Sequence, residues 1–470
     1  MKRKIKKILC LGLNSLVLSL TSFGQEAAQS DEALSWIQQN AIPIRHVQAG
    51  NDFSDLQPLK QILKDVKVVG LGEATHGTRE FFQVKHRLLE FLVKEMDFNA
   101  FALEASYAAC QPINDYVLYG IGDLATVLTG QGYVVWDTEE MAEMIGWLRE
   151  YNQSVTEEKK VKFYGLDLSN NEIGRKEILS YLHKVAPERV AATDSLFRVL
   201  AREEAKWPMQ IDAETEKILL HMLPHLQDLI YFLTENKDKL VSNSTPAAFD
   251  QVLQYTRVMK QWFMANTPAM LPPFVDKSMI RSISMAENLM YLLDREGSEA
   301  KFVVWEHNSH LARDTWNVSN FQDARNGSNL LGYQLRRKYR DGYYAFSIEF
   351  NQGSFQTRSL LPDNMLGDLK EVTVPPAPEG SLPWYLSSTN VGNLILNLRA
   401  PVDNPVVEQW LHSPHKVYLA SWANNGESQE DYIKELEVKR FYDGILFIDR
   451  TTATRPTANA LKTAARREGL

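Results

Sequence analysis

The chain has 470 residues, of which 44% are hydrophobic and 23% charged, a composition typical of soluble globular proteins. This length allows one large α/β unit with insertions or two separate domains. The formal net charge of -8 argues against nucleic acid or an anionic membrane surface as a partner.

The N-terminus has the layout of a secretory signal peptide. Five basic residues within 2–7 precede an apolar stretch, Ile8 to Leu20, and small residues follow up to Gly24. The apolar stretch is shorter than the roughly 20 residues that a membrane-spanning helix needs. We therefore predict cleavage near Gly24, export to the periplasm or the medium, and no stable membrane insertion afterwards. Cleavage would remove five positive charges, lower the net charge from -8 to -13, and leave Cys110 as the single cysteine.

Seven short runs rich in apolar and β-branched residues are predicted to be strands. Most are apolar throughout rather than alternating, as in strands covered on both faces. Helical periodicity over residues 78–94 and 139–151 separates the early runs, and strands that alternate with helices indicate a parallel sheet. The predicted strands are residues 66–71, 100–103, 161–166, 301–305, 343–348, 417–421 and 444–448.

The strand pattern stops between residues 171 and 297, where helices broken by prolines such as Pro224 are expected. The sequence thus predicts an α/β fold: a three-layer α/β/α sandwich with a mainly parallel sheet and a large helical insertion acting as a cap. Residues 358–383, richer in Pro and Gly, are predicted to form a long loop. The predicted division is a signal peptide (1–24), a first part of the α/β core (25–170), the helical cap (171–297) and a second part of the core (298–470).

Five of the predicted strands are followed by or end in ionisable residues. In open α/β sheets, ligands bind outside the carboxyl ends of the strands, so these residues should converge if the sheet is parallel. Clustered carboxylates repel one another unless a metal, histidine or arginine balances their charge. The sequence therefore predicts one polar site at this edge, formed by Glu73, Glu104, Asp167, the pair His307 and His310, and Glu349.

His76 follows Glu73 by three residues in a glycine-flanked turn ahead of a helix. A helix N-terminus disfavours imidazolium, whereas a neighbouring carboxylate favours it, and the balance suits a general base near neutral pH. Glu73 or Glu104 is expected to accept the other ring N–H of His76 and fix its tautomer. Arg281 is expected to neutralise the carboxylates or to bind an oxyanion.

Several common catalytic motifs are absent from the sequence. There is no Gly-x-Ser-x-Gly nucleophile elbow, no His-Glu-x-x-His zinc helix, no Walker loop and no dinucleotide fingerprint. Two possibilities remain for the site: hydrolysis by histidine and glutamate with water as the nucleophile, or metal binding.

The ordered motifs of this chain resemble those of the erythromycin esterase family. The resemblance extends from about Leu34 to the C-terminus. The segments that carry it are Gly70–Thr78, Ala102–Ala105, Trp147–Asn152, Tyr164–Asp167, Met285–Asn288, Trp305–His310 and Phe447–Asp449.

This resemblance implies a hydrolase that opens the lactone ester of macrolide antibiotics such as erythromycin without a covalent acyl-enzyme. His76 would activate water with support from Glu73 and Glu104, while Arg281, one of His307 and His310, and Glu349 would hold the tetrahedral intermediate. It further implies substrate binding by Lys85, Asp167 and Glu349, no cofactor and no metal. The family often carries arginine where this chain has Lys85, and aspartate where it has Ser282; lysine lacks the bidentate fork of arginine.

Two other hypotheses stay open from the sequence. The same fold could act on a different ester, such as one of an envelope polysaccharide. Alternatively, the chain could be a metal- or haem-binding protein without hydrolytic activity, because Glu73, His76, Glu104, His307 and His310 include ligand types suited to zinc or iron. The expected partner in the first two cases is a small molecule with a bulky ester.

Overall fold

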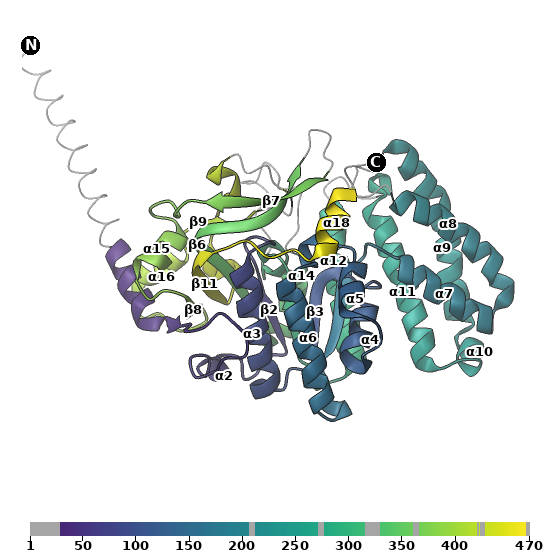
Figure 1. Ribbon diagram of the computed structural model, residues 1–470, viewed down its shortest axis with the longest axis horizontal. Coiled ribbons are helices and arrows are strands. Elements are labelled where there is room, and N and C mark those ends of the chain that lie inside the picture. The colour runs from purple at the N-terminus through teal and green to yellow at the C-terminus, as the bar shows by residue number, and fades with distance from the viewer. Residues whose placement is uncertain are drawn as a thin grey trace, which may run out of the picture.

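A nine-stranded mixed sheet organises the protein (Figure 1). The structure is a computed structural model, and it describes residues 29–205, 212–270, 277–314, 330–360, 366–420, 423 and 428–466. The predicted signal peptide lies outside the described residues. The strands of this sheet are β1 (Ile42–Pro43), β2 (Val68–Leu71), β3 (Ala100–Ser106), β4 (Lys162–Asp167), β5 (Phe302–Trp305), β6 (Tyr343–Leu360), β7 (Leu366–Val374), β8 (Leu394–Asn397) and β11 (Gly444–Thr451).

The strand order is β1-β8-β11-β6-β2-β5-β3-β4, with β7 paired to β6. All neighbours from β11 to β4 are parallel, whereas β1/β8, β8/β11 and β6/β7 are antiparallel. This confirms the predicted mainly parallel sheet. Its consequence for function is that β2, β5, β3 and β4 present their carboxyl ends side by side.

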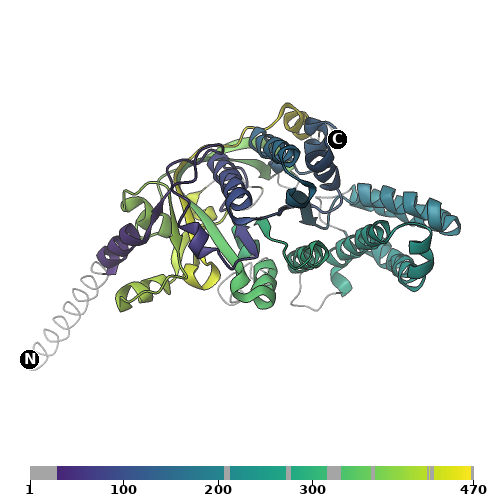
Figure 2. The ribbon, with the colours of Figure 1, turned by 90° about the horizontal axis from the view of Figure 1, so that it is seen from below.

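Helices cover both faces of the sheet and complete the three layers (Figures 1 and 2). Val68 packs with one layer and Val69 with the other, and both are fully buried, which is why β2 is apolar throughout. One layer contains α3 (Arg79–Met96), α4 (Gln111–Tyr119) and α6 (Glu139–Ser154). The opposite layer contains α12 (Lys277–Glu296) and α14 (Leu330–Tyr339).

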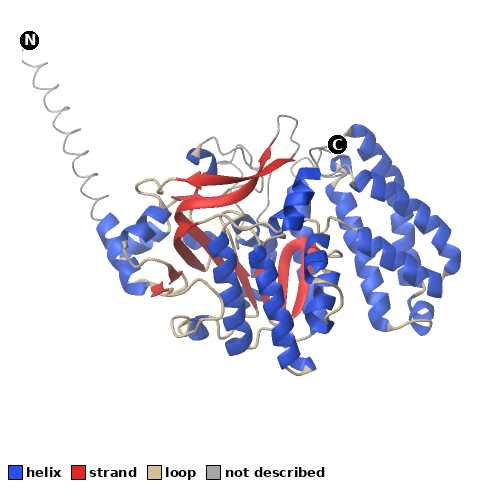
Figure 3. Cartoon of the chain, in the orientation of Figure 1, coloured by secondary structure: helices blue, strands red, loops and turns tan. Residues whose placement is uncertain are grey.

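A bundle of helices extends beyond the β4 edge of the sheet (Figure 3). It consists of α7 (Glu172–Val185), α8 (Val190–Glu204), α9 (Ala213–Glu235), α10 (Lys237–Ser242) and α11 (Pro246–Ala265). The described residues of the segment expected to be helical are mostly helical, and none of them is in a strand. The break predicted at Pro224 is wrong, because this proline lies within α9. Helix α12, predicted as part of the cap, packs on both α11 and β4 and thus joins the bundle to the sheet.

Shorter helices lie in the connections between these elements. They are α2 (Leu59–Ile62), α5 (Leu124–Gly130), α13 (Asn308–Leu311), α15 (Leu382–Ser388), α16 (Pro405–Leu411), α17 (Val438–Phe441), α18 (Ala458–Arg466) and the 3₁₀ turn η1 (Val134–Trp136). Residues 29–40 are also helical. Across the described residues, no helix has both the length and the apolar character needed to cross a membrane.

The loop predicted over residues 358–383 is in part a β-hairpin. Strand β6 runs on to Leu360 and pairs with β7, with Gly353 opposite Val374. Only alternate positions near the end of β7 are buried, including Val372 and Val374, so this edge strand lacks the continuous apolar run on which the prediction relied. The run predicted over 417–421 forms β9 (His415–Tyr418), which pairs with β10 (Ile433–Leu436) in a separate two-stranded sheet.

Candidate active site

The structure gathers most of the predicted site residues at the carboxyl ends of four adjacent parallel strands. Glu73 follows β2, Glu104 lies near the end of β3, Asp167 ends β4, and His307 comes two residues after the end of β5. The others come from nearby elements: His76 from the β2–α3 loop, Arg281 from α12 and His310 from α13. The parallel pairing brings these distant segments of the sequence together.

Two glycines allow the loop that carries Glu73 and His76 to pack closely against its neighbours. A Cβ atom on Gly72 would lie 2.1 Å from Asn308 Oδ1, and one on Gly77 would lie 1.9 Å from the carbonyl oxygen of Gln356. Neither position accepts a side chain without movement of the backbone. The loop is therefore fixed on both sides, by α13 and by β6.

Glu73 is fully buried and accepts three side-chain hydrogen bonds. His76 Nδ1 lies 2.7 Å from Oε1, while Lys85 Nζ donates to Oε2 at 2.6 Å and Trp305 Nε1 donates to Oε2 at 2.8 Å. A buried carboxylate is tolerated when it is paired and hydrogen-bonded in this way. Of the two carboxylates predicted to orient His76, Glu73 and Glu104, it is Glu73 that binds its ring.

His76 has the geometry of a general base. Burial disfavours the imidazolium form, but the hydrogen bond and charge of Glu73, together with Glu104, outweigh it and raise the pKa of His76 above its ordinary value of 6.5. Its Nε2 atom has no hydrogen-bond partner within the described part of the chain, and its side chain remains 11% exposed. Nε2 is therefore the nitrogen that can accept a proton from water.

Lys85 lies beneath Glu73. Its side chain is 0% exposed, and its Nζ atom is 4.1 Å from the centre of the Trp305 ring. Burial lowers the pKa of Lys85 to about 8, even though Glu73 partly offsets this effect. Lys85 therefore stabilises the carboxylate of Glu73. Its side chain is not accessible for the substrate contact that the resemblance implies.

Arg281 holds the acidic side of the site together. Its Nη2 atom donates to Glu104 Oε1 at 2.9 Å and to Asp167 Oδ2 at 2.7 Å, and Asp167 also accepts from the hydroxyl of Tyr133 at 2.7 Å. Burial alone would raise the pKa of both carboxyls. The positive charge of Arg281 holds the pKa of Asp167 below its ordinary value. At Glu104, His310 and Arg281 together hold the pKa well below its ordinary value.

The two histidines after β5 occupy different places. The ring of His307 lies against that of His76, with centroids 5.2 Å apart, whereas His310 Nε2 lies 3.2 Å from Arg281 Nη1. Burial and the nearby His76 lower the pKa of His307 to about 3, so this ring is neutral at physiological pH. Its Nδ1 atom accepts from the backbone N–H of Ser309 at 3.3 Å and lies 2.8 Å from Ser309 Oγ, and both contacts fit a ring with its proton on Nε2. His307 is thus a neutral donor beside the base.

Glu306 is a buried acid that the sequence analysis left without a role. It is 0% exposed, and neither of its oxygens has a hydrogen-bond partner in the described structure. Burial and the negative charge of Glu104 raise the pKa of Glu306 well above its ordinary value, which favours its protonated form.

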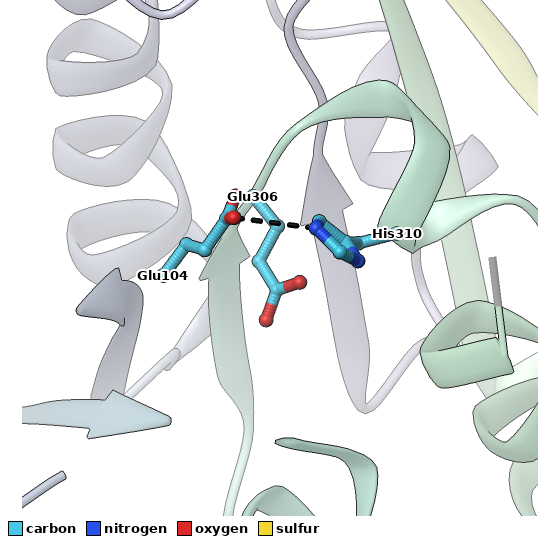
Figure 4. A group of neighbouring side chains, drawn as sticks. All are labelled: Glu104, Glu306 and His310. Atoms are coloured by element: carbon cyan, nitrogen blue, oxygen red, sulfur yellow. Dashed lines mark ion pairs between the residues drawn. The ribbon is translucent and has the colours of Figure 1, made fainter. Parts of the chain in front are cut away.

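Glu306 also belongs to the one described group with metal-ligand types in close proximity (Figure 4). One atom each of Glu104, Glu306 and His310 lie within 4.8 Å of one another. Carboxylate and imidazole ligands suit zinc or iron. The guanidinium of Arg281 already binds Glu104 and lies against His310, so a cation at this position would have to displace it.

Glu349 lies apart from the other predicted site residues. It sits within β6, which continues to Leu360, and pairs with Phe447 of β11 rather than ending a strand. Its Oε1 atom accepts from Ser347 Oγ at 2.6 Å and from Asn308 Nδ2 at 3.3 Å. Burial raises the pKa of Glu349 to about 8, and within the described structure Glu349 has no hydrogen bond to His76, Glu104 or Arg281.

Some residues of the site carried no signal in the sequence. Tyr133 is in a loop and reaches Asp167 only through the fold. Trp136 donates from Nε1 to the carbonyl of Glu104 at 2.8 Å, and its ring lies 5.6 Å from that of His76. Trp305 belongs to the motif Trp305–His310, but its hydrogen bond to Glu73 could not be predicted, because it depends on the pairing of β2 with β5.

Comparison with known proteins places this site within a family. The family model described as erythromycin esterase matches residues 93–451, a range that includes Glu104, Asp167, Arg281, His307 and His310. The chain belongs to the erythromycin esterase family. The match begins after His76, so Glu73 and His76 rest on the geometry described above.

Relatives with low identity match along almost their whole length. Erythromycin esterase type II of Escherichia coli is 24% identical over 89% of this chain and 98% of its own. YbfO of Bacillus subtilis (strain 168), named as a candidate hydrolase, is 25% identical over 96% of this chain and 99% of its own. A mutant of erythromycin esterase EreC in its open conformation has a TM-score of 0.65 and 17% identity, with 88% of this chain and 97% of that chain covered. These findings support a hydrolase with the erythromycin esterase fold.

The substitution Glu73→Gln tests the control that Glu73 exerts on His76. The amide keeps the shape but removes the negative charge that raises the pKa of His76. A general base works when deprotonated, so the acidic limb of the pH profile of kcat/KM should move to lower pH. We expect kcat to fall by about 10²-fold, the scale of general-base catalysis.

The matched control for this variant is Glu157→Gln, because Glu157 is 65% exposed and precedes β4, at the opposite end of this strand from Asp167. The control should reproduce the wild-type pH profile. An acidic limb that stays in place in Glu73→Gln would contradict the assignment.

Proposed function

We propose that this protein hydrolyses the macrocyclic lactone ester of macrolide antibiotics such as erythromycin and thereby inactivates them. The observation that carries the proposal is the Glu73–His76 pair, with Nδ1 bound to the carboxylate and Nε2 without a partner in the described structure. Membership of the family supports the choice of ester.

In the proposed reaction, Nε2 of His76 takes a proton from water as the water oxygen attacks the ester carbonyl carbon. The resulting imidazolium is stabilised by Glu73. The tetrahedral oxyanion is held by the neutral Nε2–H of His307 and by the positive charge of Arg281. The C–O bond of the lactone then breaks, and the proton on His76 passes to the leaving alkoxide. The product is an open-chain hydroxy acid, and no acyl-enzyme forms.

The proposed reaction uses no metal. Arg281 supplies the positive charge that a metal would otherwise bring to Glu104 and His310. A same-fold hydrolase acting on another ester, such as one of an envelope polysaccharide, is the alternative, and a metal- or haem-binding protein is a more distant one.

Mass spectrometry of erythromycin incubated with residues 25–470 tests the function. We expect a product heavier by one water, formed by the wild type and reduced at least about 10²-fold in His76→Asn, whose circular dichroism should be unchanged. Dialysis against a chelator should leave the rate unchanged. Full activity of His76→Asn would refute the base, and loss of activity on chelation would refute the metal-free mechanism. Hydrolysis of simple acyl esters but of no macrolide would favour the alternative substrate.

We also propose that the protein acts outside the cytoplasm, because the basic and apolar N-terminal layout is that of a signal peptide. N-terminal sequencing of the full-length protein expressed in a bacterial host should place the mature start near Gln25. An intact N-terminus on protein recovered from the cytoplasmic fraction would contradict this.

A further inference from the structure

A groove lies where the helical bundle meets the β4 edge of the sheet, and no role has been assigned to it. Its volume is about 590 Å³, within the range of small-molecule sites. Its apolar residues come mainly from the bundle, and its polar residues come both from two loops of the core and from α7 and α8 of the bundle. Its lining includes Tyr133, Asn170, Leu179, Phe197, Ala201 and Trp262.

The groove starts at the polar network of the active site. The hydroxyl of Tyr133, which lines the groove, donates to Asp167, and Asp167 binds Arg281. Tyr133 immediately precedes η1, at whose far end Trp136 packs 5.6 Å from His76. At the rise of a 3₁₀ helix, three residues span about 6 Å. Tyr133 of the groove and Trp136, which packs against the proposed base, therefore belong to one short segment of the chain.

The core side of the groove is fixed in place before any ligand binds. The side chain of Gln131 donates to the carbonyl of Tyr133 at 2.6 Å and accepts from its N–H at 2.9 Å. Asn170 has φ of 53°, a conformation that few residues other than glycine adopt. Gly132 has φ of 92°, and a Cβ there would lie 2.7 Å from Asn170 Nδ2.

The chemistry of the lining selects the kind of ligand. Phe197 and Trp262 are largely buried, and with Leu179 they give the groove an apolar wall. The three cations in the lining all have carboxylate partners that also line the groove. The pairs are Arg175 with Glu204, Lys176 with Glu172, and Arg198 with Asp194. The groove thus offers an apolar surface with a polar rim, and each cation among its described lining residues is paired with a carboxylate.

We propose that this groove binds the part of the substrate remote from the scissile ester, and that it selects large, mainly apolar ring compounds bearing hydroxyl groups. The inference rests on the proposed function, since it assumes an ester at His76. It assigns specificity to the wall formed by α7, α8 and Trp262 of α11, and leaves the chemical step to the residues at the strand ends.

The test fills the groove and measures binding separately from chemistry. Ala201 of α8 lines the groove, whereas Ala192 of the same helix is exposed and lies outside its lining. Ala201→Trp and the matched control Ala192→Trp are each made in the His76→Asn background, and the Kd for erythromycin is measured by calorimetry. We expect Ala201→Trp to weaken binding about tenfold or more and Ala192→Trp to leave it within twofold. An unchanged Kd in Ala201→Trp, an equal loss in both variants, or no binding of erythromycin at all would overturn the inference.

Turnover in the wild-type background separates this inference from the proposed function. Ala201→Trp should raise the KM for erythromycin and leave kcat/KM for p-nitrophenyl acetate within twofold, which also shows that the variant is folded. If the wild type binds erythromycin in the groove but does not open it, the proposed function fails while the groove assignment stands. If Ala201→Trp lowers the rate on the small ester as much as on erythromycin, the groove assignment fails.

Discussion

The ion pair between Glu73 and Lys85, buried without exposure of either side chain, is the interaction on which the site depends. Removing two charges from water costs several kcal/mol each unless close pairing and further hydrogen bonds offset the cost. Trp305 supplies one of these bonds, and its ring also faces the lysine. This arrangement leaves one oxygen of Glu73 directed at His76. The orientation of the base is thus set by Glu73, Lys85 and Trp305, which are buried and have no access to substrate.

The balance of charge explains why neighbouring ionisable groups have different protonation states. Glu73 is paired with Lys85, and Glu104 and Asp167 share Arg281. Glu306 forms no ion pair among the described residues, and burial together with the charge of Glu104 raises its pKa. His76 and His307 lie side by side, yet only His76 has a carboxylate on its ring, and their pKa values are displaced in opposite directions. One ring is therefore suited to accept a proton and the other to donate a hydrogen bond.

Much of this arrangement could be predicted from the sequence, and particular residues show where prediction stopped. The continuous apolar runs identified the buried parallel strands, and parallel strands necessarily bring Glu73, Glu104 and Asp167 to one edge. The hairpin of β6 and β7 was missed because an edge strand has no such run. Glu349 was placed at a strand end because its apolar run stops there, although the strand itself continues to Leu360. The partners of Lys85 and Tyr133 depend on contacts between distant segments, which local patterns do not encode.

The most direct test of the account is an NMR titration of the His76 ring, assigned by comparison with His76→Asn. The account predicts a pKa above the ordinary value of 6.5 that coincides with the acidic limb of kcat/KM. A pKa below 6.5, or a ring that titrates at a pH where the rate does not change, would contradict the role of the Glu73–His76 pair as the general base.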